Sequence, residues 1–224
     1  MTMSRSMSAT DFRREIVKMG QFRCKHGHTG LSHYNCYRKE SGIPERIGYL
    51  DIECSNLKAN FGIMLSYCIK VRDKNKIYKS VITKEELENG KLDKELVKRC
   101  INDMKNFDHL MGHYSSGYDI PFIRTRALYW GLKFPEYGEM LHTDVYYLAR
   151  RVLCLHSNRQ DVIAETILGH TEKTRLNSRH WIMALQGDKK ALAYVLKHNI
   201  GDVIDLEKNH KKLEVFARKS NRSM

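Results

Sequence analysis

Two acidic residues stand two positions apart inside an otherwise apolar run of this sequence. The run covers residues 46–53, and Ile52 separates Asp51 from Glu53. An alternating run of this kind predicts a β-strand, on which residues two apart project from the same face. Two carboxylates on one face of an apolar strand are costly to bury unless a cation offsets their charge, and Mg²⁺ or Mn²⁺ suits oxygen ligands. The pair therefore indicates a metal site, with an edge strand that exposes one face to water as the alternative.

Two later stretches carry further acids. Asp119 follows a loop of small residues at 112–118 and stands where a helix is predicted to begin, a place where aspartate is also a common N-cap. His198 and Asp202 are four apart in a long helical pattern, and so they share a helix face. Taken alone, that pair also fits an ordinary surface contact.

The three stretches form an ordered set: LDIE at residues 50–53, YDIPF at 118–122 and HNIGDV at 198–203. With this order and spacing, the chain resembles the DEDD 3′–5′ exonucleases of the ribonuclease H-like superfamily. It is most similar to stand-alone domains related to the proofreading exonuclease of family B DNA polymerases. The segments 143–150 and 161–169 are similar to the intervening parts of those domains, so the resemblance covers about residues 46–215.

The resemblance implies two-metal hydrolysis of phosphodiester bonds, with two Mg²⁺ or Mn²⁺ ions. Asp51 would bridge the ions. Glu53 and Asp202 would complete the site of the ion that activates water, and Asp119 would hold the second ion near the leaving 3′-oxygen. His198 would orient or deprotonate the attacking water.

The chain departs from the family pattern at the last of these roles. One branch of the family places Tyr four residues before the last Asp, and the other places His five residues before it. Here His198 stands four before Asp202, and Lys197 stands five before it. The pattern alone therefore does not assign the general base.

A dense group of soft ligands precedes the acids: Cys24, His26, His28, His33 and Cys36. Two Cys and two of the three His could hold Zn²⁺ tetrahedrally in a small knuckle, in a structural rather than a catalytic site. The alternative is a solvated basic loop with two incidental thiols.

The residues that flank this group would form a basic surface for a phosphate backbone; they are Arg23, Lys25, Arg38 and Lys39. The remaining cysteines lie in apolar runs and are expected in the core: Cys54, Cys68, Cys100 and Cys154.

The elements that must position these side chains follow from the periodicity. Strands are predicted at 46–53, 63–71, 77–82, 109–114 and 140–143, the first three as an antiparallel meander. Helices are predicted at 83–104 with Thr83 as N-cap, 121–130, 145–152, 160–168 and 189–212. The fold class is α/β, a ribonuclease H-like mixed β-sheet flanked by helices with a small N-terminal Cys/His element. The expected divisions are 1–45, 46–218 and a basic tail at 219–224.

The charge of the chain points to a polyanionic partner. The net charge is +13; residues 1–46 hold 9 basic and 4 acidic residues, and residues 208–224 hold 6 and 1. Nucleic acid is the commonest partner of such a surface, although basic ends can serve solubility alone. No segment approaches the ~20 apolar residues of a membrane-spanning helix, and no secretory signal is recognisable. We therefore expect no membrane partner and a cytoplasmic protein.

These observations predict a metal-dependent 3′–5′ exonuclease on single-stranded or frayed nucleic acid, DNA more than RNA, with a protein partner in replication or repair. Two alternatives remain at this stage: a non-catalytic nucleic-acid-binding or adaptor module on a nuclease fold, and an endonuclease or RNase using the same metal site. Three aromatic residues near the acids are candidates for stacking on bases: Tyr114, Tyr118 and Phe122.

Overall fold

A computed structural model describes residues 8–172, 174–217 and 222–223 of the chain. The chain divides into two compact units, Met1–Glu45 and Arg46–Met224. The predicted boundary between residues 218 and 219 lies outside the described residues.

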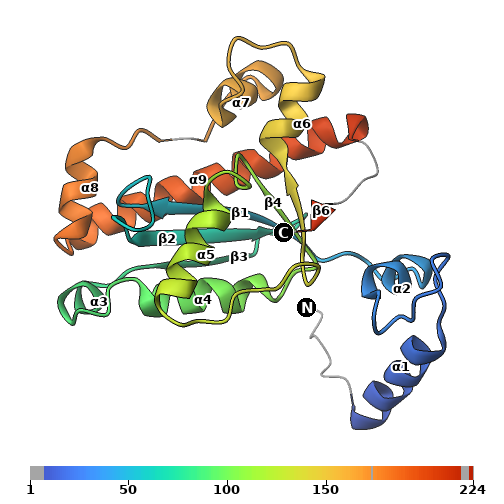
Figure 1. Ribbon diagram of the computed structural model, residues 1–224. Helices are drawn as coiled ribbons and strands as arrows, with labels where there is room; N and C mark the ends of the chain where they lie inside the picture. Colours follow the sequence, from blue (N-terminus) through green and yellow to red (C-terminus); the bar gives the residue numbers. More distant parts are fainter. Residues whose placement is uncertain (1–7, 173, 218–221, 224) are drawn as a thin grey trace. The chain divides into compact units, whose positions relative to one another are not determined.

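The larger unit is built on a mixed sheet (Figure 1). Its strands are β1 (Ile47–Cys54), β2 (Met64–Val71), β3 (Ile77–Val81), β4 (His109–Gly112), β5 (Leu141–Asp144) and the short β6 (Arg222–Ser223), in the order β3-β2-β1-β4-β5-β6. The predicted antiparallel meander of the first three strands is confirmed, and β4 and β5 then add parallel to β1. The carboxyl ends of β1, β4 and β5 therefore meet at one edge of the sheet, which is where such sheets bind ligands.

Helices cover both faces of this sheet, as predicted. They are α3 (Lys84–Glu88), α4 (Lys94–Met104), α5 (Asp119–Tyr129), α6 (Val145–Val152), α7 (Gln160–Leu168), α8 (Ser178–Leu185) and α9 (Lys189–Leu213), followed by the 3₁₀ turn η1 (Glu214–Phe216). In Figure 1, α4 and α5 lie on one side of the sheet and the long α9 crosses the other. The sequence did not predict α8.

One predicted helix is wrong, because residues 83–104 form two helices. Thr83 does cap the first, in a capping box with Glu86. The chain then turns through Gly90, with φ +73°, and Leu92, with φ +44°, conformations that no α-helix contains. The break lets the buried carboxylate of Asp93 accept hydrogen bonds from the Met64 backbone and from Arg126 and Trp130.

Strand β1 separates two hydrophobic clusters because its side chains alternate. Leu50 and Ile52 pack with residues of α4 and α5, whereas Tyr49 packs with residues of α6, α7 and α9. Asp51 and Glu53 share the face of Tyr49. The fold thus directs both acids toward α9.

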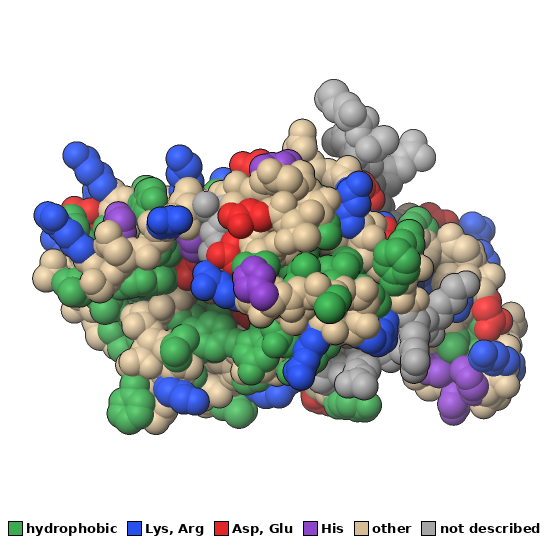
Figure 2. Space-filling view, turned by 90° about the horizontal axis from the view of Figure 1, so that it is seen from above, with side chains coloured by type: hydrophobic (Ala, Val, Ile, Leu, Met, Phe, Trp, Pro, Cys, Tyr) green, Lys and Arg blue, Asp and Glu red, His purple; other side chains and the backbone are tan. Residues whose placement is uncertain are grey.

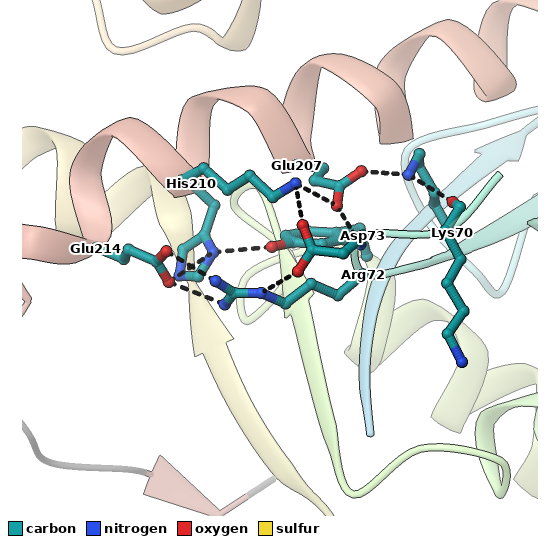
Figure 3. A network of polar contacts seen from close by, with 9 residues as sticks. Lys70, Arg72, Asp73, Glu207, His210 and Glu214 are labelled. Atoms are coloured by element: carbon teal, nitrogen blue, oxygen red, sulfur yellow. Dashed lines mark hydrogen bonds and ion pairs between the residues drawn. The ribbon is translucent and has the colours of Figure 1, made fainter. Parts of the chain in front are cut away.

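A network of polar contacts fixes the C-terminal half of α9 against the turn between β2 and β3 (Figure 3). Lys70 pairs with Glu207, which also accepts a hydrogen bond of 2.7 Å from the backbone N–H of Asp73. Arg72 binds both carboxylate oxygens of Glu214, at 2.9 and 2.8 Å. These ion pairs, one at Glu207 of α9 and one at Glu214 just after its end, fix the rotation of the helix and so the face that α9 turns toward β1.

The N-terminal unit holds two helices that the sequence did not predict, α1 (Ala9–Gln21) and α2 (Tyr34–Glu40). Arg38 of α2 is buried and pairs with Glu45 at 3.0 Å, so its expected place on a basic phosphate-binding surface is wrong. In the larger unit Cys154 is exposed, which corrects its expected place in the core. It lies just beyond the end of α6, where the chain leaves the packed face.

Candidate active site

The acids of β1 meet the predicted third motif on α9. The side-chain amide of Asn199 donates a hydrogen bond of 2.7 Å to Oδ2 of Asp51. Asn199 is buried, and the bond joins residues 148 positions apart in the sequence. It ties α9 to β1 at the level of the acidic pair.

Glu53, His198 and Asp202 form a compact group whose ligand atoms all lie within 4.8 Å of one another. Nε2 of His198 is 3.5 Å from Oε1 of Glu53 and 3.5 Å from Oδ2 of Asp202. The other ring nitrogen, Nδ1, lies 2.8 Å from the hydroxyl of Thr174. Although His198 stands four residues before Asp202, its imidazole faces the acids, and Thr174 fixes the orientation of the ring.

Asp119 reaches the same place from α5. It is the first residue of that helix, whose N-cap is Tyr118, and Oδ1 of its side chain accepts a 3.1 Å hydrogen bond from the backbone N–H of Ile52. Burial raises the pKa of Asp119 to about 7; the hydrogen bond from Ile52 opposes this rise, and the carboxylates of Asp144 and Asp202 add to it. An N-cap role alone therefore does not describe this aspartate.

Asp144, at the end of β5, is a site residue that the sequence reasoning missed. One of its oxygens accepts hydrogen bonds from the backbone N–H groups of Tyr114 and Tyr146 at 2.8 and 3.0 Å, and the other accepts from that of Ser116 at 3.0 Å. It thereby holds the loop between β4 and α5, in which Tyr114 has a positive φ of 58°. Its place after a parallel strand was the signal that could have identified it.

A pocket of about 460 Å³ opens beside the acids; its lining residues are Asp51, His113, Tyr114, Tyr146, Arg159, Gln160 and Asp202. The rings of Tyr114 and Tyr146 lie edge to face, 5.2 Å apart, and Tyr114 is 47% exposed. Of the three aromatic residues expected to stack on bases, Tyr114 alone lines this pocket. Phe122 is buried and Tyr118 packs against the core.

A glycine of the third motif permits a close approach between two segments. A Cβ added at Gly201 would lie 2.7 Å from the carbonyl oxygen of Glu172. The segment that contains Glu172 also binds α9 through Asp205, whose carboxylate accepts hydrogen bonds from the Thr171 hydroxyl and the Glu172 N–H. Gly201 thus lets the segment lie close enough for Thr174 to reach His198.

The donors at this site suit a hard divalent cation. Glu53 and Asp202 present carboxylate oxygens to the same point in space, and Asp119 and Asp202 are only 4% and 6% exposed. Carboxylates brought together in this way repel one another and lose hydration, unless a cation compensates them. Oxygen ligands are those that Mg²⁺ and Mn²⁺ prefer.

The N-terminal unit brings its soft ligands together as well. The donor atoms of Cys24, His26, His28 and His33 all lie within 4.8 Å of one another. Sγ of Cys36 lies 3.8 Å from Nδ1 of His26. This unit therefore contains a second group able to bind a metal.

Comparisons with known proteins agree with this architecture. The model of the RNase H superfamily matches residues 48–213. Among solved structures, the family B DNA polymerase from the hyperthermophilic archaeon Pyrobaculum calidifontis is similar with a TM-score of 0.62 and 17% identity, over 77% of this chain. This chain spans a quarter of that polymerase's length, 25%. The search of curated proteins gave no match.

Within the described residues, the structure has no helix that combines the length and the apolar character needed to cross a bilayer. The family match covers the whole mixed sheet from β1 to β5, with the helices that flank it and each of the acids described above. The chain belongs to the RNase H superfamily.

Proposed function

We propose that this protein is a DEDD-type 3′–5′ exonuclease that hydrolyses single-stranded or frayed DNA with the help of two Mg²⁺ or Mn²⁺ ions. One observation carries the proposal: β1 and α9 bring Glu53, His198 and Asp202 together beside a pocket that Asp51 and Asp202 line, and Asp119 of α5 binds the backbone of β1 between Asp51 and Glu53. The fold similarity to a family B DNA polymerase supports the choice of an exonuclease. The carboxylates and the imidazole support metal-dependent hydrolysis.

Each acid would serve as a ligand. Asp51, which lines the pocket, would bridge the two ions; Glu53 and Asp202 would complete one ion site and Asp119 the other. Bound divalent ions lower the pKa of water and offset negative charge on a phosphodiester. The acids of this chain would hold those ions.

His198 would hold the attacking water and receive its proton. If Thr174 accepts a hydrogen bond from Nδ1–H, Nε2 is left with its lone pair toward the acids, which is the tautomer that a general base needs. The distances of 3.5 Å from Nε2 to Glu53 and Asp202 place the ring at the edge of the carboxylate group. In this assignment, His198 stands four residues before the last Asp, the position at which one branch of the family has Tyr.

The pocket supports a nucleotide as substrate. Tyr114 and Tyr146 offer aromatic surfaces on which a terminal base can stack, and Arg159 offers a cation for a phosphate. On the face shown in Figure 2, Lys and Arg side chains are spread among acidic and apolar ones. Because every base has a stacking face, we expect weak sequence preference and a requirement for unpaired ends.

We assign the soft ligands of the N-terminal unit to Zn²⁺, because thiolate and imidazole favour zinc over magnesium. We also propose a protein partner in replication or repair, since the similar structure is a DNA polymerase of which this chain spans a quarter.

The test uses a 5′-labelled linear single-stranded DNA, a circular single-stranded DNA and an RNA of the same sequence, each with Mg²⁺, Mn²⁺ or chelator. We expect a metal-dependent ladder that shortens from the 3′ end of the linear DNA, an intact circle and slower cleavage of RNA. Cleavage of the circle would make the protein an endonuclease. Salt-sensitive binding of every substrate with no cleavage would make it a binding module.

A further inference from the structure

The N-terminal unit has too small an apolar core to explain its fold. Among its described residues, the buried hydrophobic side chains are those of Cys24 and Tyr37. Helix α1 buries no residue, and its Phe12 and Val17 are more than half exposed. Units of about 40 residues or fewer usually need a disulfide, a metal or a partner to fold, and both cysteines of this unit are free thiols in the structure.

Two pairs of donor atoms in this unit have the spacing of ligands in a tetrahedral zinc site, and two further pairs are slightly more widely spaced. Bonds of about 2.3 Å to sulfur and 2.0–2.1 Å to nitrogen place two tetrahedral ligands about 3.3–3.6 Å apart. Nδ1 of His28 and Nδ1 of His33 are 3.3 Å apart, and Sγ of Cys24 is 3.6 Å from Nδ1 of His33. Sγ of Cys24 is also 3.7 Å from Nδ1 of His26 and 4.0 Å from Nδ1 of His28.

The backbone around these donors is shaped to present them. The N–H of Gly27 donates to the carbonyl of Cys24 at 2.8 Å, and the N–H of Cys24 donates to the carbonyl of His28 at 3.0 Å. Gly27 takes a positive φ of 80°, which glycine adopts without strain. This tight turn carries three of the donors, Cys24, His26 and His28.

His33 belongs to the same arrangement from the other side of the loop. It occupies the N-cap position of α2 but makes no side-chain capping bond. Its imidazole instead lies against Cys24 and His28. Because the His33 side chain turns toward the other donors and does not cap α2, it is positioned to bind a metal ion.

Resting on the assignment of this cluster to zinc, we propose that residues 8–45 fold around one Zn²⁺ bound by Cys24 Sγ and by Nδ1 of His26, His28 and His33, with Cys36 outside the coordination shell. The sequence offers five donors and zinc takes four. Cys24, His26, His28 and His33 form the set whose donor atoms are all within 4.8 Å of one another. Cys36 approaches His26, at 3.8 Å, but does not belong to that set. One thiolate and three imidazoles therefore replace the two cysteines and two histidines that the sequence favoured.

Four protein ligands leave no open position, so the ion is structural. Its binding supplies the folding free energy that the small core lacks. The folded loop then presents exposed Arg23 and Lys25 beside the ion. The carboxylate site of the larger unit is a different kind of metal site. All four proposed zinc ligands come from the N-terminal unit itself.

The first test measures zinc per chain by elemental mass spectrometry in the full-length protein, after incubation with zinc and gel filtration in excess Mg²⁺. We expect one zinc per chain in the parent and in the variants Cys36→Ser, Cys154→Ser and Glu53→Gln. Cys24→Ser and His33→Gln should lose it. Cys154→Ser is the matched control, because that cysteine is exposed in the other unit. Glu53→Gln removes one ligand of the group formed by Glu53, His198 and Asp202, so zinc retained by this variant is not bound at the acids.

A second measurement replaces zinc by Co²⁺, whose thiolate charge-transfer absorption counts the bound sulfur atoms. We expect equal intensity in the parent and in Cys36→Ser. A halved intensity in Cys36→Ser would overturn the ligand set, as would zinc retention by Cys24→Ser. A parent chain that takes up no zinc would overturn the proposal as a whole, whatever the nuclease assay shows.

Limited proteolysis tests the link to folding. Zinc removal should greatly accelerate cleavage within residues 8–45 and leave residues 46–217 intact. Unchanged cleavage of the N-terminal unit after complete removal of zinc would contradict a fold that depends on the ion.

Discussion

The side-chain amide of Asn199 donates a 2.7 Å hydrogen bond to Oδ2 of Asp51, and it does so from the helix that also carries His198 and Asp202. This bond fixes one carboxylate oxygen of Asp51 and leaves the carboxylate facing the pocket. Residues that orient a metal ligand in this way matter nearly as much as the ligand itself.

We therefore predict that Asn199→Ala lowers hydrolysis by about 10–100-fold through weaker metal binding. The measurement is the rate as a function of Mn²⁺ concentration, in which the half-saturating concentration should rise. Asn209→Ala is the matched control, because Asn209 is also a buried amide of α9 but bonds the backbone carbonyl of Gln160. Equal metal dependence in the two variants would contradict the role of Asn199.

Thr174 acts on His198, so its hydroxyl should affect the rate of the chemical step. Thr174→Val keeps the shape of the side chain and removes the partner of Nδ1. We expect kcat to fall about 10–100-fold, a shifted pH profile and little change in KM. Thr166→Val, which removes an exposed hydroxyl of α7 bonded to the Val162 carbonyl, should behave as the parent. A change confined to KM would assign Thr174 to substrate binding instead.

His210 should make stability depend on pH. Burial lowers its pKa to about 4, against about 6.5 in an unfolded chain. Below pH 6.5 the unfolded state therefore binds more protons than the folded state, and stability falls as the pH drops toward 4. The loss approaches about 3 kcal/mol for this one residue.

Urea unfolding between pH 7 and pH 4.5 measures this dependence. His210→Gln should have a shallower slope of unfolding free energy against pH than the parent. Some slope should remain, because burial also lowers the pKa of His142 to about 4. An unchanged slope would show that the pKa of His210 is the same in the folded and unfolded states.

The periodicity of apolar residues in the sequence predicted most of the strands and helices. The helices at 145–152 and 160–168 were predicted with the limits that the structure has, since apolar residues recur on one face of each. The break at Gly90 was not predicted, because it depends on the burial of Asp93 against Arg126, and that contact is distant in sequence. Helices α1 and α2 were not predicted, although Phe12 and Ile16 stand four apart in α1; α1 buries no residue, and α2 buries Tyr37 and Arg38.

The sequence predicted those parts of the site in which the spacing of two residues determines whether they share a face of a strand or helix. Asp51 and Glu53 share a strand face and His198 and Asp202 a helix face. In the structure, Nε2 of His198 lies 3.5 Å from both Glu53 and Asp202, and Asp51 is hydrogen-bonded to the neighbouring Asn199 of the same helix. Partners such as Asp144, Thr174 and Asn199 were not predicted as site residues. Their roles depend on which loops and helices meet, and no local pattern encodes that.

We propose that the four carboxylates and His198 form one metal-dependent hydrolytic centre. Hydrolysis of a 5′-labelled single-stranded DNA by Glu53→Gln, beside the exposed control Glu165→Gln, tests it most directly. We expect about a 10²–10³-fold loss for Glu53→Gln with an unchanged melting temperature, the parent's rate for Glu165→Gln, and no hydrolysis in chelator. Equal rates in the two variants, or hydrolysis that persists in chelator, would contradict it.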